Sequence, residues 1–181
     1  MRRHSLAVLG IISPFLLSPV AEAQVREKYD AFTDQTTVTS FVLFDSPLLG
    51  TSKDVLLLYT FRGKVQQTST DTVDFIIKLT SVGTADISAG GWKLSSHPPL
   101  YFLVDDTSRF EFPTSAADQK AGLIGRLGYS LDETVSYAIP TPDLLRIVSG
   151  TRVAFKVGPW ERRLKDKELQ RIRDLAARLG H

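Results

Sequence analysis

Histidine, cysteine and carboxylate side chains supply most of the metal ligands and proton-transfer groups in proteins, so their number limits the chemistry a chain can do. The sequence contains no cysteine and three histidines, His4, His97 and His181. A zinc or copper site built on histidine needs two or more imidazoles that converge, and thiolate chemistry has no residue to use. We therefore predict no metal and no cofactor for this chain.

A serine beside an imidazole is the arrangement of a hydrolytic nucleophile and its base, and Ser95 and Ser96 directly precede His97. Neighbouring residues of an extended chain point to opposite faces, however, and catalytic triads are assembled from distant segments. The two prolines that follow His97 indicate a turn instead. If the chain is a hydrolase, His97 is the imidazole base it would use.

Asp105, Asp106 and Glu111 offer oxygen atoms that suit either a calcium site or the carboxylate pair of a glycosidase. The two aspartates also open the run Asp105-Asp106-Thr107-Ser108, whose short polar side chains are typical of a hairpin turn. No EF-hand spacing accompanies them. The turn accounts for these acids, and we assign no catalytic residue to the chain.

Gly122, Gly125 and Gly128 recur at intervals of three, but they match neither a dinucleotide-binding nor a phosphate-binding fingerprint. Each glycine weakens a helix, so the spacing argues against a stable helix over residues 115–131. We interpret the three as turn or packing glycines.

Two further groups of residues suggest binding surfaces. Trp92 and Trp160 would suit a glycan-stacking platform, although burial in the core is the usual place for tryptophan in a small β domain. The last predicted helix carries a basic face that would suit an anionic surface, made of Lys167, Arg171, Arg173 and Arg178. Acidic residues are interleaved with these cations, which is typical of a solvated outer face.

Residues 1–23 have the pattern of a secretory signal peptide. Arg2 and Arg3 precede an apolar run over residues 5–20, and Ala21-Glu22-Ala23 matches the small-residue cleavage pattern, so Gln24 is the predicted new N-terminus. The apolar run of about 16 residues is shorter than the roughly 20 that a spanning helix needs. We therefore predict cleavage after Ala23, and no membrane span in the mature chain.

Charge and composition after the leader limit the partners and the compartment. Two of the 22 Lys and Arg residues and one of the 20 Asp and Glu residues lie in residues 1–23, so the remainder carries a net charge of +1. A nearly neutral body gives no electrostatic footprint for nucleic acid. The lack of cysteine and of asparagine favours a bacterial protein of the periplasm or the extracellular space over a disulfide-bonded or glycosylated one.

Apolar residues alternate with polar ones over most of the mature chain, which predicts about eight or nine short strands. The strands are expected at residues 37–44, 54–62, 72–80, 92–94, 100–104, 109–112, 134–139, 151–157 and 160–164. Residues 24–35 are expected to form a polar lead-in segment. We expect residues 54–62 to be buried on both faces, because Leu56 and Leu58 oppose a row of apolar residues.

Residues 141–181 form a distinct C-terminal α/β block with two helical patterns. Thr141 is expected to cap the first helix, Pro142 to occupy its first position, and Gly150 to end it. An apolar stripe over residues 166–179 predicts the second helix. The whole predicts a single α+β domain over residues 24–181, an antiparallel sheet or sandwich with a helix–hairpin–helix block. An all-β sandwich with a trailing helix is the alternative.

The segment Leu100-Tyr101-Phe102-Leu103-Val104-Asp105, followed by Arg109, resembles a segment of a family of uncharacterised exported bacterial proteins. An early Thr36-Thr37-Val38 strand and a closing strand-and-helix block over residues 151–179 are similar to features of the same family. The resemblance implies an exported, strand-rich protein and implies no catalytic residue.

Three functions are consistent with this sequence. The first is a non-enzymatic binding or accessory module of the cell envelope or extracellular space, with an envelope protein as its partner. The second is a hydrolase of cell-wall or extracellular polymers that uses Asp and Glu, with His97. The third is a carrier of a small ligand, held in a cavity between sheet and helix.

The leader gives the first prediction. In a bacterial host, the exported protein should have an intact mass that corresponds to a chain beginning at Gln24, because the signal peptidase cleaves after Ala23. Mass spectrometry of the periplasmic and culture fractions measures this directly. A chain that still begins at Met1 in those fractions would contradict the interpretation.

Overall fold

The computed structural model describes residues 25–45, 50–66, 69–83, 94, 97–123 and 128–179. The predicted signal peptide and its cleavage site between Ala23 and Gln24 lie outside the described residues. Within the described part, no helix combines the length and the apolar character needed to cross a membrane.

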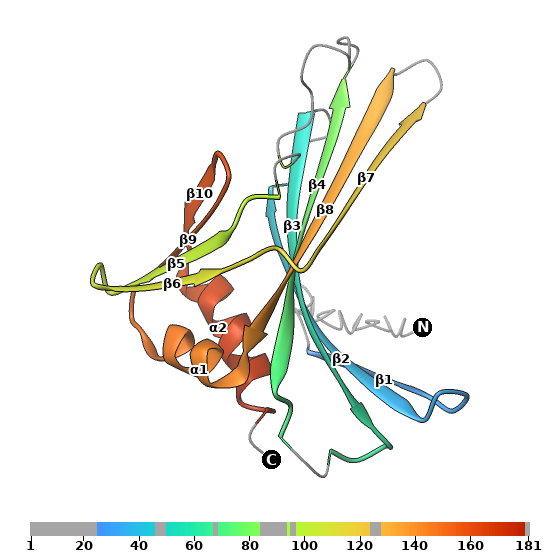
Figure 1. The fold of residues 1–181 in the computed structure, drawn as a ribbon, viewed down its shortest axis with the longest axis vertical. Helices are drawn as coiled ribbons and strands as arrows, with labels where there is room; N and C mark the ends of the chain where they lie inside the picture. Colours follow the sequence, from blue (N-terminus) through green and yellow to red (C-terminus); the bar gives the residue numbers. More distant parts are fainter. Residues whose placement is uncertain are drawn as a thin grey trace, which may run out of the picture.

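The described residues contain ten strands in two antiparallel sheets, together with two helices (Figure 1). The elements are β1 (Arg26–Asp30), β2 (Gln35–Asp45), β3 (Gly50–Arg62), β4 (Thr72–Gly83), β5 (Leu100–Val104), β6 (Ser108–Phe112), β7 (Ala116–Leu123), β8 (Tyr129–Pro140), α1 (Thr141–Ser149), β9 (Val153–Val157), β10 (Trp160–Arg163) and α2 (Asp166–Ala176). The larger sheet has the order β1-β2-β3-β4-β8-β7, and the smaller has the order β10-β9-β5-β6. The predicted α+β architecture with its helix–hairpin–helix block is confirmed.

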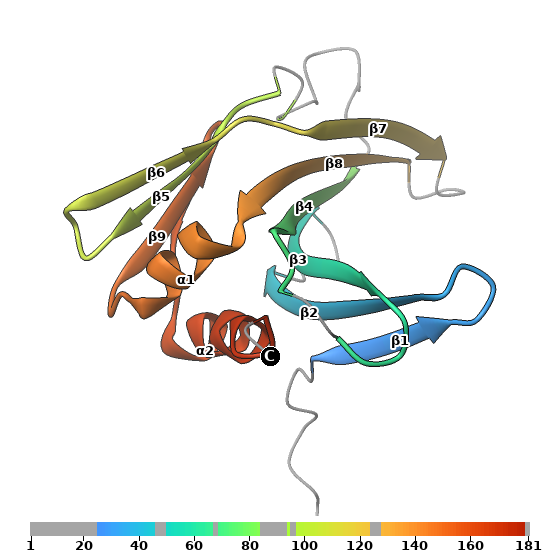
Figure 2. The same ribbon diagram turned by 60° about the horizontal axis from the view of Figure 1, so that its bottom comes forward.

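The smaller sheet and both helices lie on the same side of the larger sheet (Figures 1 and 2). The faces that meet are apolar, because every second residue of a strand points the same way. On β4 the buried row is Val73, Phe75, Ile77 and Leu79, as the alternation predicts. Phe75 packs edge-on against Phe102 of β5 and Phe155 of β9, with ring centroids 5.4 and 5.9 Å apart.

Helix α2 closes the end of this core beside β2. Its buried residues are Glu168, Leu169, Ile172, Leu175 and Ala176. The Ser40 hydroxyl, fully buried on β2, donates to the Arg171 carbonyl at 3.3 Å. The Arg173 guanidinium donates to the Val148 and Gly150 carbonyls at 2.9 and 2.7 Å, so it joins α2 to the end of α1.

Helix α1 ends at Gly150, as predicted, but glycine is required at this position by close packing and not by a left-handed backbone conformation. Gly150 has an ordinary φ of −67°, and a Cβ at this position would overlap the Val104 side chain of β5. The start of the helix differs from the prediction. Pro140 is the N-cap, and Thr141 instead donates its hydroxyl to the Thr70 carbonyl, which joins α1 to the segment before β4.

Two other predictions about strands are wrong. The lead-in segment contains β1, which pairs with β2 from Arg26 opposite Thr39 to Asp30 opposite Gln35. Its side chains are almost all exposed, so it carries no alternating apolar signal. Strand β3 is buried on one face only, because Leu56 and Leu58 are half-buried on the outer face of the larger sheet.

Residues 115–131 form no helix in their described part, in line with the glycine spacing. They supply β7 and the start of β8. Gly128, before β8, has a φ of +103°, which L side chains rarely adopt. Gly122 lies within β7, and Gly125 lies outside the described residues.

A buried carbonyl joins the two sheets and gives the second prediction. The Pro98 carbonyl accepts from Tyr137 Oη at 2.8 Å and from Thr114 Oγ1 at 3.0 Å. Tyr137→Phe and Thr114→Val should each lower the free energy of unfolding by about 1 kcal/mol. The double variant should lose about 1 kcal/mol more than the sum of the two single losses, because the buried Pro98 carbonyl then has neither hydrogen-bond donor. Urea unfolding of the four proteins measures the coupling, and strictly additive losses would contradict it.

Candidate functional site

The predicted acidic candidates lie in the β5–β6 turn, where they form structural contacts. Asp105 Oδ1 accepts from the Thr151 backbone N–H at 3.0 Å, the Thr151 hydroxyl at 2.7 Å and the Arg152 N–H at 2.8 Å. These hydrogen bonds lower the pKa of Asp105 below its ordinary value, and the bond from the Thr151 hydroxyl has the largest effect. Asp106 forms ion pairs with Arg152 and Arg163 at 3.0 and 3.3 Å. The two aspartates therefore join the hairpin turn to the loop after α1.

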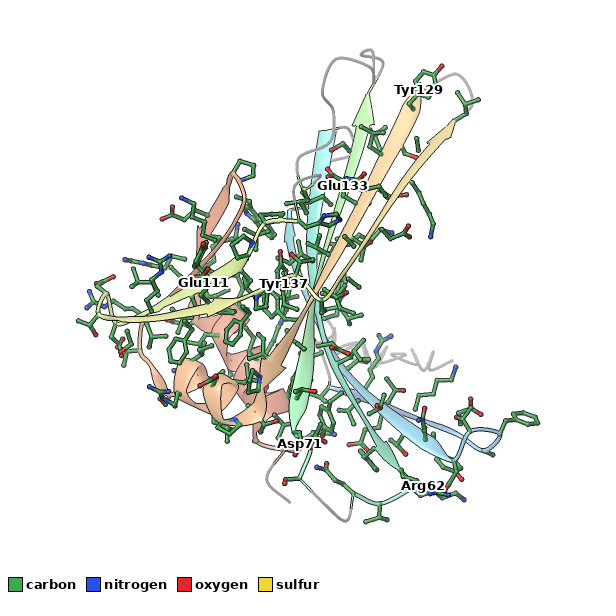
Figure 3. All side chains as sticks on the ribbon, in the orientation of Figure 1. Arg62, Asp71, Glu111, Tyr129, Glu133 and Tyr137 are labelled. Carbon is green, nitrogen blue, oxygen red and sulfur yellow. The ribbon has the colours of Figure 1, made fainter. Side chains whose placement is uncertain are left out.

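Glu111 is separate from this turn. It lies opposite Tyr101 on the neighbouring strand and is 3.8 Å from Arg109 (Figure 3). Among the described residues, no group of three or more histidines and acids is placed to hold a metal ion.

His97 is an exposed residue with a φ of +49°, and its N–H bonds to the Leu94 carbonyl at 3.2 Å. This is the turn that the following prolines predict. Ser95, Ser96 and His181 lie outside the described residues.

Trp160 is buried on β10, with its ring 5.0 Å from that of Phe155, so it offers no stacking platform. Trp92 lies outside the described residues. Two of the four cations of α2 and the turn after it are engaged in the fold. Arg173 bonds to α1, and Arg178 forms an ion pair with Glu27 of β1.

Two buried polar residues lie on β8, of which Tyr137 falls within a predicted strand and Glu133 was not identified from the sequence. Glu133, which is 2% exposed, accepts from the Leu94 backbone N–H at 2.6 Å (Figure 3). Tyr137 is fully buried, and burial raises its pKa to about 12, so that it remains a hydrogen-bond donor. The predicted strand at 134–139 began one residue too late to include Glu133 in the inward row of Leu131, Val135 and Tyr137.

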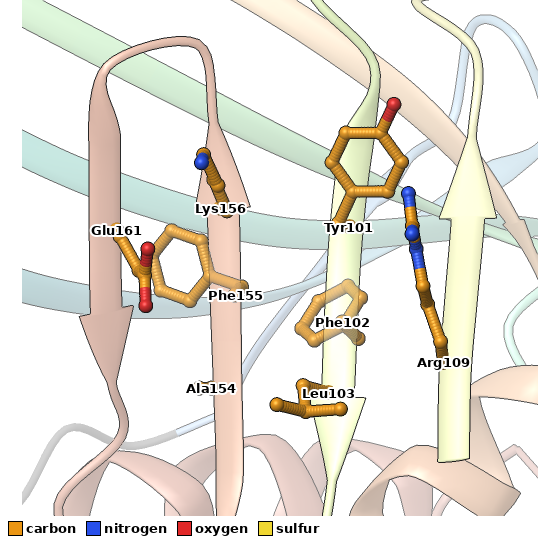
Figure 4. A pocket seen from close by; sticks show the side chains of 8 residues that line it. All are labelled: Tyr101, Phe102, Leu103, Arg109, Ala154, Phe155, Lys156 and Glu161. Carbon is orange, nitrogen blue, oxygen red and sulfur yellow. The ribbon is translucent and has the colours of Figure 1, made fainter. Parts of the chain in front are cut away.

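A concave surface lies on the outer face of the smaller sheet (Figure 4). It is a pocket of about 320 Å³, lined by Tyr101, Phe102, Leu103, Arg109, Ala154, Phe155, Lys156 and Glu161. All four strands of the sheet contribute to it. Phe102 and Phe155 are buried between the two sheets, and they form part of the floor of this pocket.

Strand register places the outward side chains of this face in two rows. One row runs Glu111, Tyr101, Lys156 and Glu161 from β6 to β10, and the next runs Arg109, Leu103, Ala154 and Arg163. We call these eight residues the outer-face patch. Its two inner strands contribute Tyr101, Leu103, Ala154 and one cation, Lys156, and its two edge strands contribute only charged residues.

One apolar side chain of the patch is open to solvent. Leu103 is 41% exposed although β5 is an inner strand of its sheet, whereas Tyr101 and Ala154 are half-buried. The Arg109 guanidinium lies over the Tyr101 ring at 4.5 Å from its centroid, an arrangement that cation–π attraction stabilises. Of the charged groups, Arg163 is paired with Asp106, whereas Lys156 and Glu161 form no ion pair within the described chain.

The outer-face patch was also missed in the sequence, although part of its signal was present. The predicted strand 100–104 places Leu100, Phe102 and Val104 on one face, which leaves Tyr101 and Leu103 on the other. Tyrosine and arginine are enriched among the residues that dominate binding energy, so Tyr101 and Arg109 on this face are the part of the signal that the sequence carries. The pairing of β5 with β9, which adds Lys156 and Ala154, is not encoded locally.

Asp105 gives the third prediction. Asp105→Asn keeps an acceptor oxygen and tolerates the φ of +50°, but it removes the charge, so it should lower the melting temperature by a few degrees at neutral pH. A lowered folded-state pKa means that the stabilisation is present above the ordinary carboxyl pKa and is lost as the pH falls through the folded value. The difference between the two proteins should therefore shrink below about pH 4. A difference that stays constant from pH 7 to pH 3 would contradict this.

Comparison of the chain with protein-family models, with curated proteins and with solved structures gave no significant match. The function therefore has to be argued from the outer-face patch and the chemistry of its residues.

Proposed function

We propose that this chain is an exported, non-enzymatic binding protein that docks a protein partner on the outer-face patch. The observation that carries the proposal is the exposure of Leu103, beside a half-buried Tyr101, on an inner strand of a sheet whose opposite side is packed. An exposed apolar side chain bordered by charged groups is typical of a protein–protein interface.

The residue types of the patch support a protein partner. Tyrosine and arginine are enriched among the residues that dominate binding energy, and both are present as a stacked pair in Tyr101 and Arg109. Because the guanidinium covers one face of the Tyr101 ring, that face is not free to stack on a sugar. The partner should present an apolar side chain to Leu103 and an acidic group to Lys156, which has no ion pair within the described chain.

The two other functions have less support from the described residues. A carrier would need a cavity between sheet and helix, whereas the pocket described above lies on the outer face of the smaller sheet and is lined by no residue of a helix. A polymer hydrolase would need two converging carboxylates, and Asp105 and Asp106 are used in the turn. Export remains part of the proposal, supported by the pattern of residues 1–23.

The proposal predicts that a charge at the centre of the patch abolishes partner binding. Leu103→Asp should reduce capture of the partner at least tenfold, because it places a carboxylate in a contact that excludes water. The tagged protein is expressed in its native host, crosslinked in intact cells and purified, and the captured proteins are quantified by mass spectrometry.

Leu145→Asp is the matched control. Leu145 lies on α1, and its exposure of 44% is close to the 41% of Leu103, but it is not part of the patch. Capture should be unchanged in this variant, and both variants should keep the wild-type circular dichroism spectrum. If every captured protein is retained by Leu103→Asp, or lost equally from both variants, the outer-face patch is not the docking site.

A further inference from the structure

Strand β7 differs from the other edge strands in being exposed along its whole length. All eight of its residues are exposed, whereas β6 and β10 each have a buried residue and β1, the other edge of the larger sheet, has the half-buried Tyr29. Within the described chain β7 pairs with β8 alone, and it forms one margin of the larger sheet in both views (Figures 1 and 2). It therefore presents a row of backbone groups that a further strand can bind.

The usual protections of an edge are few on this strand. Residues 116–123 contain no proline, and their register with β8 is continuous from Ala116 opposite Ser136 to Leu123 opposite Tyr129, without a bulge. The charges it carries are Asp118 and Lys120, which form an ion pair with each other at 2.6 Å. Most of the other side chains are small, so they would not obstruct a neighbouring strand.

The sequence of β7 is complementary to itself when two copies run antiparallel. A two-fold axis perpendicular to the sheet keeps each side chain on its own face. One residue of β7 must then lie directly opposite its own copy, with the axis midway between the two. An axis at Asp118 would oppose two aspartates, and an axis at Lys120 would oppose two lysines. An axis at Gln119 instead places Asp118 of each copy opposite Lys120 of the other.

The remaining pairs in the Gln119 register are also compatible. Ala117 lies opposite Ala121, and Ala116 lies opposite Gly122, so no bulky side chains collide. Gln119 lies opposite its own copy, where the two amides can exchange hydrogen bonds. Opposite charges that face each other across strands stabilise a sheet, and like charges destabilise it.

We propose that a second copy of this chain adds to β7 in the Gln119 register and so extends the six-stranded sheet across a two-fold axis. The interface is independent of the outer-face patch, which lies on the other sheet. A strand pairing of this length is small compared with the roughly 1,200 Å² of a stable interface, so the dimer should be weak and concentration-dependent.

Charge reversal tests the register. The full sequence from Met1 is expressed, so that the predicted leader can be removed on export. The dissociation constant of the dimer is then measured by sedimentation equilibrium. Asp118→Lys and Lys120→Asp should each weaken the dimer at least tenfold. The combined variant, Asp118→Lys with Lys120→Asp, should restore it, which also shows that neither substitution unfolds the chain.

The absence of cysteine allows a second measurement on the same surface. Under mild oxidation Gln119→Cys should form a covalent dimer, because two opposed residues lie about 4.5–5.5 Å apart between Cα atoms, within disulfide range. Ala121→Cys, on the same face, should not, since its two copies would be about 14 Å apart. A wild-type chain that is monomeric at all accessible concentrations overturns the proposal. The proposal is also overturned if the single charge reversals do not weaken the dimer, if the combined variant does not restore it, or if the two cysteine variants crosslink equally.

Discussion

The packing of one aromatic cluster between the two sheets determines how this molecule is built. Phe75 of β4 meets Phe102 of β5 and Phe155 of β9, and Phe155 in turn meets Trp160 of β10. Tilted and edge-on ring pairs of this kind stabilise a core by about 0.5–1.5 kcal/mol each beyond the area they bury. The cluster fixes which face of the smaller sheet is inward, since a one-residue change of register would turn every side chain over.

The exposed surfaces follow from that constraint. Because Phe102 and Phe155 point inward, Tyr101, Leu103 and Lys156 must point outward, on strands that are held rigid from behind. The turn contacts of Asp105 and the contacts of Arg173 attach the smaller sheet and α1 to the C-terminal helix. A rigid scaffold behind an apolar surface lowers the entropy cost of binding, which is why the outer-face patch is suited to a partner.

The sequence predicts the parts of this fold whose strands have one buried face. The β5–β6 hairpin and the block from α1 to α2 were located correctly, because alternation, turn residues and helical periodicity all agree there. Strands β1 and β7 were not located, since an edge strand exposed on both faces has no apolar period. Only part of the outer-face patch could be predicted from the sequence. Tyr101 and Leu103 follow from alternation. Lys156 and Glu161 join them through strand pairings between distant segments, which no local pattern encodes.

If a partner docks on the outer-face patch, Leu103 is covered when the protein is in its native setting. This can be measured as the rate at which a permeant maleimide modifies the thiol introduced by Leu103→Cys, in intact cells and after purification, with Leu145→Cys as reference. We expect rapid modification of the purified Leu103→Cys protein, strong protection of the same thiol in cells, and equal rates in both settings for the reference. Equal rates at Leu103→Cys in both settings would contradict it.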